Sequence, residues 1–269
     1  MERLVNERVI TSLTNPTVKA IRALHARKGR DESGLFLAEG LKFIGEALDL
    51  DRAPRTLLVG QDARPHPLLD RAIKATTANG GEIITVNRAI LEKVSRKENP
   101  QTVLGVFQQV FTLLDKLNPR AAPAWVALEQ VRDPGNLGTI IRTCDAAGAG
   151  GVILIDDCCD PYSVEAVRAT MGSVFAVSVT KTTTDAFLAW RATWPGSVIG
   201  TRLDAGHDYR AAPVEHPALI LMGNEQAGLT DRLAAACDVN VKIPMRGRAD
   251  SLNLAIATGI MVYAATEGT

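Results

Sequence analysis

The sequence predicts an α/β protein with two domains, because two sets of apolar strands and helical segments are separated by a proline-containing stretch. From residue 124 onward, short apolar runs alternate regularly with segments of helical periodicity. Continuous apolar strands of this kind are typical of a mostly parallel sheet that is covered on both faces. The stretch 118–123 contains Pro119 and Pro123 and favours an extended connection between the domains.

The first part of the chain, residues 1–112, predicts a small α/β domain. Apolar residues recur at helical spacing over residues 18–26, and the glycine-containing run 28–34 breaks this pattern. Short apolar strands and two further helices follow; we expect the strands at 35–38, 56–60, 82–86 and 103–110, and the helices at 40–50 and 67–79. Residues 113–123 are predicted to form the linker to the second domain.

The second part, residues 124–269, predicts a larger domain of repeated strand and helix units. We expect strands at 125–129, 151–155, 174–179, 197–201, 218–222 and 239–243. We expect helices at 137–147, 164–171, 184–193, 230–236 and 252–266. Since ligands of such sheets bind at the carboxyl ends of the strands, the loops that follow these strands are the candidate site.

Three of these loops are rich in Gly, Asn and Ser: NLGTIIR at 136–142, MGNEQAGL at 222–229 and IPMRGRADSLN at 243–253. In their order and spacing they resemble the three signature motifs of the SpoU/TrmH family of S-adenosylmethionine-dependent RNA 2′-O-methyltransferases. The resemblance covers roughly residues 124–266. It implies a deep C-terminal trefoil knot whose crossings form the cofactor pocket, S-adenosylmethionine as cofactor, and a homodimer built on the knotted domains.

The resemblance also implies which residues take part in the reaction. By position in the motifs, the catalytic residues are Asn136, Arg142, Glu225, Ser251 and Asn253. A guanidinium group is a poor base at neutral pH, so we expect Arg142 to combine two roles. It grips the target phosphate and stabilises the developing alkoxide, and the proton leaves to Arg142 itself or to water.

Each of these residues also has a purely structural interpretation. Asn136 could cap the helix that follows it, and Glu225 could be a surface turn residue. Arg142 could pair with Asp145 one helical turn away. Ser251 is a candidate N-cap of the last helix, with Asn253 inside its first turn.

Cofactor binding is implied at a second group of positions. The glycines of the second motif let the backbone approach a ligand closely, and backbone groups of the third motif hold the adenosine moiety in the family. The cofactor-binding residues that the resemblance implies are Thr201, Leu203, Gly223, Ile243, Met245 and Leu252.

Charge is distributed unevenly, although the formal net charge is zero. Residues 1–120 hold 19 Lys and Arg against 14 Asp and Glu, a net charge of +5, and residues 121–269 hold 11 against 16, a net charge of −5. We therefore expect Arg22, Arg27 and Lys28, in a basic cluster that begins at Arg3, to bind RNA phosphates. The alternative is that these three side chains only form the solvent-exposed face of a helix and bind no RNA.

The substrate class follows from short patterns in the first domain. Residues 14–19, 36–40 and 98–101 resemble the N-terminal substrate-binding domain of two-domain SpoU enzymes, which is similar to a ribosomal-protein RNA-binding fold. The resemblance favours ribosomal RNA over tRNA. A non-catalytic RNA-binding or ribosome-assembly protein on the same fold is a further alternative.

Other classes of function are disfavoured by the sequence. No apolar run reaches the roughly 18 residues of a membrane span and the start lacks a signal-peptide core, so we expect a cytoplasmic protein. The four cysteines form no C-x-x-C pattern, and the four histidines are scattered, so no metal is expected. Gly148, Gly150 and Gly151 precede a strand and lack the glycine spacing of a dinucleotide site; Gly148 is better interpreted as a helix C-terminal cap.

Overall fold

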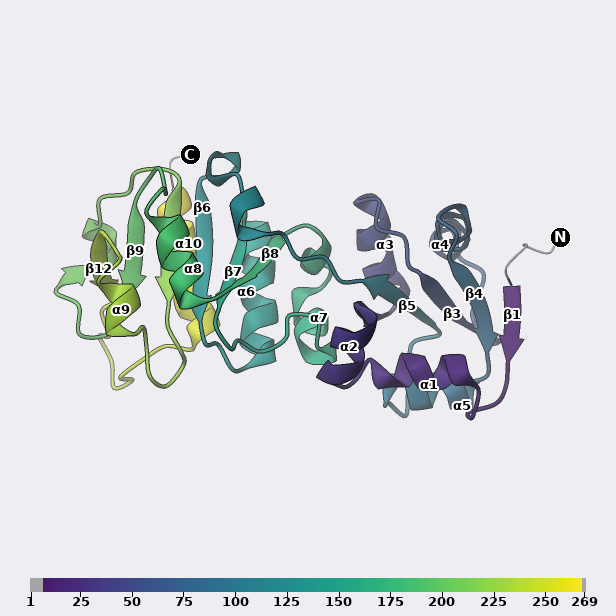
Figure 1. Cartoon of the computed structure of the whole chain (residues 1–269). Coiled ribbons are helices and arrows are strands. Elements are labelled where there is room, and N and C mark those ends of the chain that lie inside the picture. The colour runs from purple at the N-terminus through teal and green to yellow at the C-terminus, as the bar shows by residue number, and fades with distance from the viewer. Residues whose placement is uncertain (1–6, 268–269) are drawn as a thin grey trace. The chain divides into compact units, whose positions relative to one another are not determined.

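The computed structural model describes residues 7–267 of the chain, which form two compact units. The first unit comprises Met1–Gln109 together with Tyr162–Phe175, and the second comprises Val110–Pro161 together with Ala176–Thr269 (Figure 1). Arg3, the first member of the predicted basic cluster, lies outside the described residues.

The first unit is built on a mixed five-stranded sheet in the order β1-β4-β3-β5-β2. Its strands are β1 (Glu7–Ile10), β2 (Leu35–Glu39), β3 (Thr56–Gly60), β4 (Glu82–Val86) and β5 (Val103–Gln108). Strand β5 runs antiparallel to β2 and β3, and the other pairs are parallel. The helices are α1 (Pro16–Ala23), α2 (Arg27–Ser33), α3 (Leu41–Asp49), α4 (Pro67–Ala78), α5 (Arg88–Ser95) and α7 (Val164–Thr170).

Apolar side chains cover both faces of this sheet. Helices α1 and α5 pack on one face through Val18, Ile21, Ile90 and Val94, and α3 and α4 pair with each other on the other face (Figure 1). The predicted strands at 56–60 and 82–86 are confirmed to the residue. Strand β1 and helix α5 were not predicted.

The prediction that residues 28–34 break the helical pattern is wrong, because α2 occupies Arg27–Ser33. Gly29 makes this second helix possible, since a β-carbon there would lie 2.2 Å from the carbonyl oxygen of Ala23 at the end of α1. Gly34 ends α2 in the left-handed conformation, with φ of +66°.

An aromatic cluster fixes the segment Tyr162–Phe175 within the first unit. The ring of Tyr162 lies 4.7 Å from that of Phe36, and the ring of Phe175 lies 4.9 Å from that of Phe107. Phe43 adds an edge-on contact with Phe175 at 5.4 Å. Buried aromatic pairs of this kind contribute beyond the area they bury.

The second unit contains a seven-stranded sheet in which every pairing is parallel. The order is β10-β12-β9-β11-β6-β7-β8. The strands are β6 (Ala124–Glu129), β7 (Gly151–Ile155), β8 (Ser178–Thr182), β9 (Val198–Thr201), β10 (His207–Asp208), β11 (Ala218–Met222) and β12 (Val239–Lys242). The prediction of an α/β fold with a mostly parallel sheet is confirmed.

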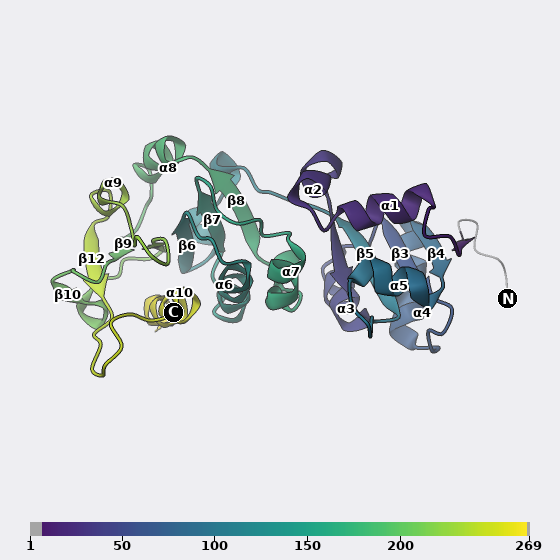
Figure 2. The ribbon, with the colours of Figure 1, turned by 90° about the horizontal axis from the view of Figure 1, so that it is seen from below.

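Helices cover both faces of this sheet, as the continuous apolar strands predicted. Helices α6 (Pro134–Ala146) and α10 (Leu254–Thr266) pack on one face, and α8 (Thr184–Arg191) and α9 (Asp231–Ala234) lie on the other (Figure 2). Alternate residues of β6 divide between the two cores: Val126 faces α6 and α10, and Trp125 faces α8 and α9. Gly148 follows the end of α6 with φ of +67°, as expected for a helix cap.

Two segments differ from the sequence prediction. The strand predicted at 174–179 is displaced to Ser178–Thr182, because Ser173–Phe175 forms a 3₁₀ turn whose Phe175 joins the aromatic cluster. The stretch 118–123, expected to be extended, contains a 3₁₀ turn at Pro119–Ala121. The carbonyl oxygen of Pro119 accepts a hydrogen bond from the indole of Trp125 at 3.0 Å.

Candidate active site

The three predicted loops meet at one cavity in the second unit. Strands β12, β9, β11 and β6 are neighbours in the sheet and run parallel, so their carboxyl ends lie at one edge. The loops after these strands and the start of α10 enclose a cavity of about 430 Å³. This volume falls within the range of roughly 300–1,000 Å³ that is typical of small-molecule sites.

The loop after β11 has no space for a side chain at Gly223. A β-carbon there would lie 2.0 Å from the carbonyl carbon of Gly228 and 2.0 Å from the backbone nitrogen of Leu229. Asn224 then closes the turn, since its side-chain oxygen accepts hydrogen bonds from the backbone N–H groups of Gln226 and Ala227 at 2.9 and 3.1 Å. This close approach of the backbone is what the glycines of the motif predicted.

Asn224 also ties this loop to the loop after β6. Its side-chain amide donates to the carbonyl oxygen of Gln130 at 2.7 Å. Gln130 has φ of +49°, a conformation that residues with a side chain adopt infrequently. Asn224 was not among the residues predicted from the sequence, although its place between Gly223 and Glu225 was a signal.

Glu225 is the centre of a hydrogen-bond network that joins all three loops. Its carboxylate accepts from the backbone N–H groups of Arg132 and Asp133, both at 3.2 Å, and from the side-chain amide of Asn136 at 3.4 Å. The side-chain oxygen of Asn136 in turn accepts from the amide of Asn253 at 2.8 Å. Glu225 therefore holds the first loop and, through Asn136, the start of α10.

Neither Asn136 nor Ser251 caps a helix, although the sequence made both candidates. Asp133 caps α6 by accepting from the backbone N–H of Asn136 at 2.6 Å, so Asn136 lies in the first turn with its side chain free for the network. Ser251 is not the cap of the last helix. Asn253 caps α10 by accepting from the backbone N–H groups of Ala255 and Ile256, because the helix begins at Leu254.

Arg142 is the one predicted catalytic residue that does not line the cavity. It lies on α6 with an exposed side chain. Within residues 7–267 this side chain makes no ion pair or hydrogen bond, and Asp145 is not its partner. The other four, Asn136, Glu225, Ser251 and Asn253, all line the cavity.

The six predicted cofactor-binding residues, Thr201, Leu203, Gly223, Ile243, Met245 and Leu252, also line the cavity. Thr201 donates its hydroxyl to the carbonyl oxygen of Leu221 at 3.0 Å, which links the ends of β9 and β11. Arg202 also lines the cavity and was not predicted from the sequence. Hydrogen bonds to the carboxylates of Asp204 and Asp231 raise the pKa of this guanidinium above its ordinary value.

The thiol of Cys159 lies close enough to Glu225 to be affected by its charge. Burial raises the pKa of the Cys159 thiol to about 12, and the neighbouring Cys158 and Glu225 add to the shift. The thiol is therefore protonated at neutral pH. In the part of the chain that the structure describes, no group of three or more His, Cys, Asp or Glu side chains is placed to hold a metal ion.

A pocket at the carboxyl ends of parallel strands, with a glycine turn as one wall and a polar network beside it, is typical of a cofactor-binding α/β enzyme. The chain belongs to the SpoU rRNA methylase family, whose model matches residues 123–263. A second model, the MRM3-like substrate binding domain, matches residues 15–105.

Several relatives align over nearly the whole chain. A 23S rRNA (guanosine(2553)-2′-O)-methyltransferase from Bacillus subtilis, RlmP, is 31% identical over 94% of this chain and 97% of its own length. A crystal structure of an AdoMet-bound rRNA methyltransferase from Sinorhizobium meliloti has 47% sequence identity and a TM-score of 0.90, covering 96% of this chain and 97% of that one. The AdoMet complex of AviRb from Streptomyces viridochromogenes has 29% identity and a TM-score of 0.83, covering 94% and 97%.

Proposed function

We propose that this protein transfers a methyl group from S-adenosylmethionine to a ribose 2′-hydroxyl of ribosomal RNA. The observation that carries the proposal is the convergence of ten predicted site residues on one cavity, joined by the network of Glu225, Asn136 and Asn253. The family and the relatives named above support the reaction.

Ribosomal RNA is favoured over tRNA by both parts of the chain. The relatives that align over more than nine-tenths of the chain include two enzymes named for 23S rRNA, from Bacillus subtilis and Streptomyces viridochromogenes. The substrate-binding model that matches residues 15–105 supports an N-terminal part that presents this RNA.

The size and the lining of the cavity suit S-adenosylmethionine. Aliphatic and thioether side chains of Leu203, Ile243, Met245 and Leu252 provide apolar walls. Among the described residues, the backbone N–H groups of Ile243 and Leu252 make no hydrogen bond within the chain, so both are available to a ligand. An apolar pocket with a few converging polar groups is the usual form of a cofactor site.

The residues of the chain position the RNA and assist loss of the proton. S-adenosylmethionine, when bound, supplies a methyl group that is already activated by the positive sulfur. The Glu225 network fixes the amides of Asn136 and Asn253 at the cavity, where they orient the ribose. Arg142 grips the phosphate of the target nucleotide and stabilises the developing alkoxide, while Ser251 contributes a hydroxyl at the cavity wall.

The two parts of the sequence divide these tasks. The first domain, residues 1–112, holds the RNA. The second domain, residues 124–269, carries the catalytic site, and the linker of residues 113–123 joins the two domains. In the structure, Tyr162–Phe175 is grouped with the first unit. The proposal for residues 124–269 includes a C-terminal trefoil knot.

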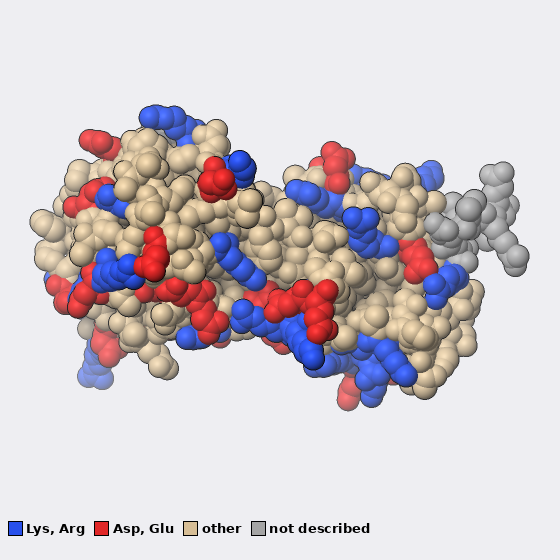
Figure 3. All heavy atoms as spheres, in the orientation of Figure 1, with Lys and Arg blue, Asp and Glu red and all other residues tan. Residues whose placement is uncertain are grey.

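Basic side chains on α1 and α2 support RNA binding by the first part. Lys and Arg gather over these helices, with Asp and Glu between them (Figure 3). Arg27 and Lys28 are exposed and lie 3.7 and 3.8 Å from the carboxylates of Asp31 and Glu32. Exposed pairs of this kind contribute only about 0–1 kcal/mol, so RNA phosphates can replace the carboxylates. Arg30 is different, since it is buried and donates to the carbonyl oxygen of Leu24.

Replacing Arg22, Arg27 and Lys28 together by Ala is expected to weaken RNA binding and flatten its salt dependence. For each phosphate that is no longer neutralised, the slope of log affinity against log salt falls by about one. The modified nucleotide should stay the same, because phosphate contacts position the RNA and bases specify it. Salt titrations of both proteins on one RNA measure this; identical slopes would leave the three residues as a solvated helix face.

A homodimer is supported by helix α10. Its sequence contains no charged residue, and one face is buried through Leu254, Met261 and Val262. On the rest of the helix Ile256 and Tyr263 are 56% and 55% exposed. A helix that is apolar all round is normally covered on all sides, which a second copy of the chain would provide. Sedimentation of the full chain tests this proposal; a monomer at micromolar concentration contradicts it.

The cytoplasm is the proposed location, because the proposed substrate is ribosomal RNA. No helix within the described range 7–267 is long and apolar enough to cross a membrane. Localising the tagged full-length protein in cells tests this; recovery outside the cytoplasm contradicts it.

Comparing RNA from cells with and without the gene tests the function. We expect one ribose 2′-O-methyl group of 23S rRNA to disappear in the deletion and to return when the purified protein and S-adenosylmethionine act on the unmethylated RNA. Loss of a tRNA methyl group instead would select the alternative substrate. Binding of rRNA without any methyl transfer would identify a non-catalytic RNA-binding protein.

A further inference from the structure

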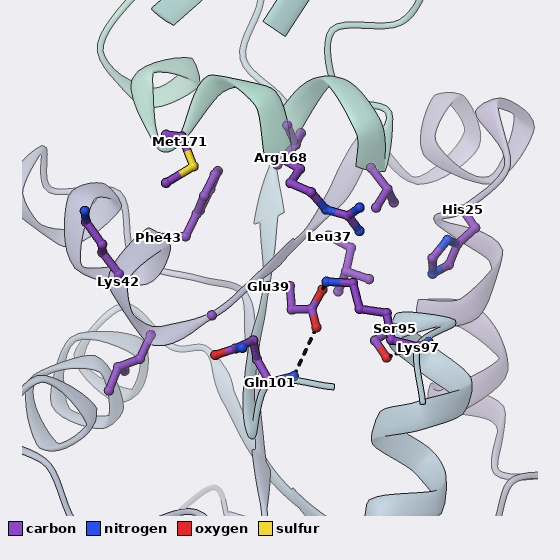
Figure 4. A pocket seen from close by; sticks show the side chains of 14 residues that line it. His25, Leu37, Glu39, Lys42, Phe43, Ser95, Lys97, Gln101, Arg168 and Met171 are labelled. Carbon is purple, nitrogen blue, oxygen red and sulfur yellow. Dashed lines mark hydrogen bonds and ion pairs between the residues drawn. The ribbon is translucent and has the colours of Figure 1, made fainter. Parts of the chain in front are cut away.

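A second cavity, of about 290 Å³, lies within the first unit, and its lining includes none of Arg22, Arg27 and Lys28. Its walls come from the turn between β2 and α3, the segment after α5, and helix α7 (Figure 4). Residues 36–40 and 98–101, which contribute to these walls, resemble the substrate-binding domain of two-domain SpoU enzymes. The proposed reaction assigns no role to either segment.

The charges around this cavity leave an excess of positive charge. Glu39 and Lys97 form an ion pair, with side chains only 14% and 36% exposed. The Glu39 carboxylate also accepts from the backbone N–H of Gln101 at 3.1 Å, so its charge is already compensated (Figure 4). Lys42 and Arg168 also line the cavity, and neither side chain has an ion pair or hydrogen bond with another described residue.

Polar groups that can read a base lie beside these cations. The side-chain amide of Gln101 makes no hydrogen bond inside the described part of the chain, which leaves both its donor and its acceptor available. The Nε2 of His25 lies 2.6 Å from the carbonyl oxygen of Val94, to which it donates. Burial lowers the pKa of His25, so its ring is neutral and Nδ1 remains an acceptor at the cavity wall.

The remaining walls are apolar. Leu37, Phe43, Val164 and Val167 line the cavity. Met171 also lines it and is 49% exposed. Its φ of +53° is that of the residue that ends α7, so its side chain stands at the C-terminal end of this helix.

We propose that this cavity receives one unpaired nucleotide of the RNA substrate. The base lies against the apolar wall of Val167 and Met171 and is read by Gln101. Arg168 and Lys42 lie on opposite sides of Phe43, so each attracts a different phosphate of the RNA backbone that flanks the base (Figure 4). Proteins read RNA sequence mainly from unstacked bases, which they hold by apolar contact and by hydrogen bonds to the base edges. The inference rests on the proposed function and adds to it a site that selects the target RNA at a distance from the reacting ribose.

Matched charge variants of the full-length protein test the phosphate part. Lys42→Gln with Arg168→Gln removes two positive charges at the cavity, and Lys74→Gln with Arg64→Gln removes two at exposed positions of the same unit that lack ion pairs. With an unmodified 23S rRNA transcript as probe, the cavity variant should lower the salt slope by about one for each phosphate it no longer binds, and the control should not. Equal slopes for the two variants overturn the proposal.

Chemical footprinting of the same complex tests the base part. The wild-type protein should protect the base edge of one unpaired nucleotide outside the methylated position, and Gln101→Ala should lose that protection while the rest of the footprint stays. Retained protection overturns the assignment. Both experiments measure RNA binding, so their results can be interpreted even if the wild-type protein does not methylate the transcript. Absence of methylation by the wild-type protein would reject the proposed reaction and not the proposed nucleotide site.

Discussion

Arg142→Ala is expected to abolish methyl transfer while the affinity for S-adenosylmethionine changes no more than a few-fold. Arg142 is exposed on α6 and lies outside the lining of the proposed cofactor cavity, so its removal should take no contact from the cofactor. The loss should be at least roughly 10²–10³-fold in rate, the cost of removing one group that stabilises transition-state charge. Calorimetry with S-adenosylmethionine and a methyl-incorporation assay on rRNA measure the two effects.

Arg232→Ala provides the matched control. Arg232 is an exposed arginine on α9, on the other face of the same sheet, and pairs with Asp185. Its substitution should leave the rate unchanged. Substantial residual transfer by Arg142→Ala, or an equal loss in both variants, would remove Arg142 from the catalytic residues.

Gly223→Ala is expected to weaken cofactor binding strongly. The new methyl group would lie 2.0 Å from backbone atoms of Gly228 and Leu229, and backbone cannot move aside as a side chain can. Overpacking of this severity costs about 3 kcal/mol. If that cost falls on the bound conformation of the loop, affinity drops roughly 100-fold. Calorimetric titration with S-adenosylmethionine measures it.

Gly247→Ala is the control for this substitution. Gly247 lies in the loop after β12, and a β-carbon there meets no atom within 4 Å. The control should bind the cofactor normally. Gly223→Ala with wild-type affinity would mean that the turn between Gly223 and Gly228 does not form the cofactor wall.

Local patterns predicted most of the second unit. Apolar runs gave the strands at 151–155 and 218–222 to the residue, because a buried parallel strand is apolar along its whole length. The loops after such strands meet at one edge, and ten of the residues that the family resemblance implied line the cavity there. The prediction of Ser251 as the cap of the last helix was wrong, since Ser and Asn both cap helices well and the sequence pattern does not fix the residue at which the helix begins.

The first unit was harder to predict because its contacts join distant parts of the sequence. Strand β1 has only four residues and pairs with β4, more than seventy residues later. Tyr162 and Phe175 meet Phe36 and Phe107, and periodicity carries no information about such pairs. Helix α5 could have been predicted, because Asn87 is a helix-capping residue type and Ile90, Leu91 and Val94 follow it at helical spacing.

The placement of Tyr162–Phe175 also has a consequence for how the protein is made. The N-terminal unit is discontinuous, so on the ribosome its sheet is complete at β5 while the residues that finish its aromatic cluster are still more than fifty codons from synthesis. Domains usually fold in order as they emerge. Here the first unit must wait for part of the second to be translated, and nascent chains arrested before residue 162 should be more sensitive to protease than chains arrested well beyond residue 175, once that segment has left the exit tunnel.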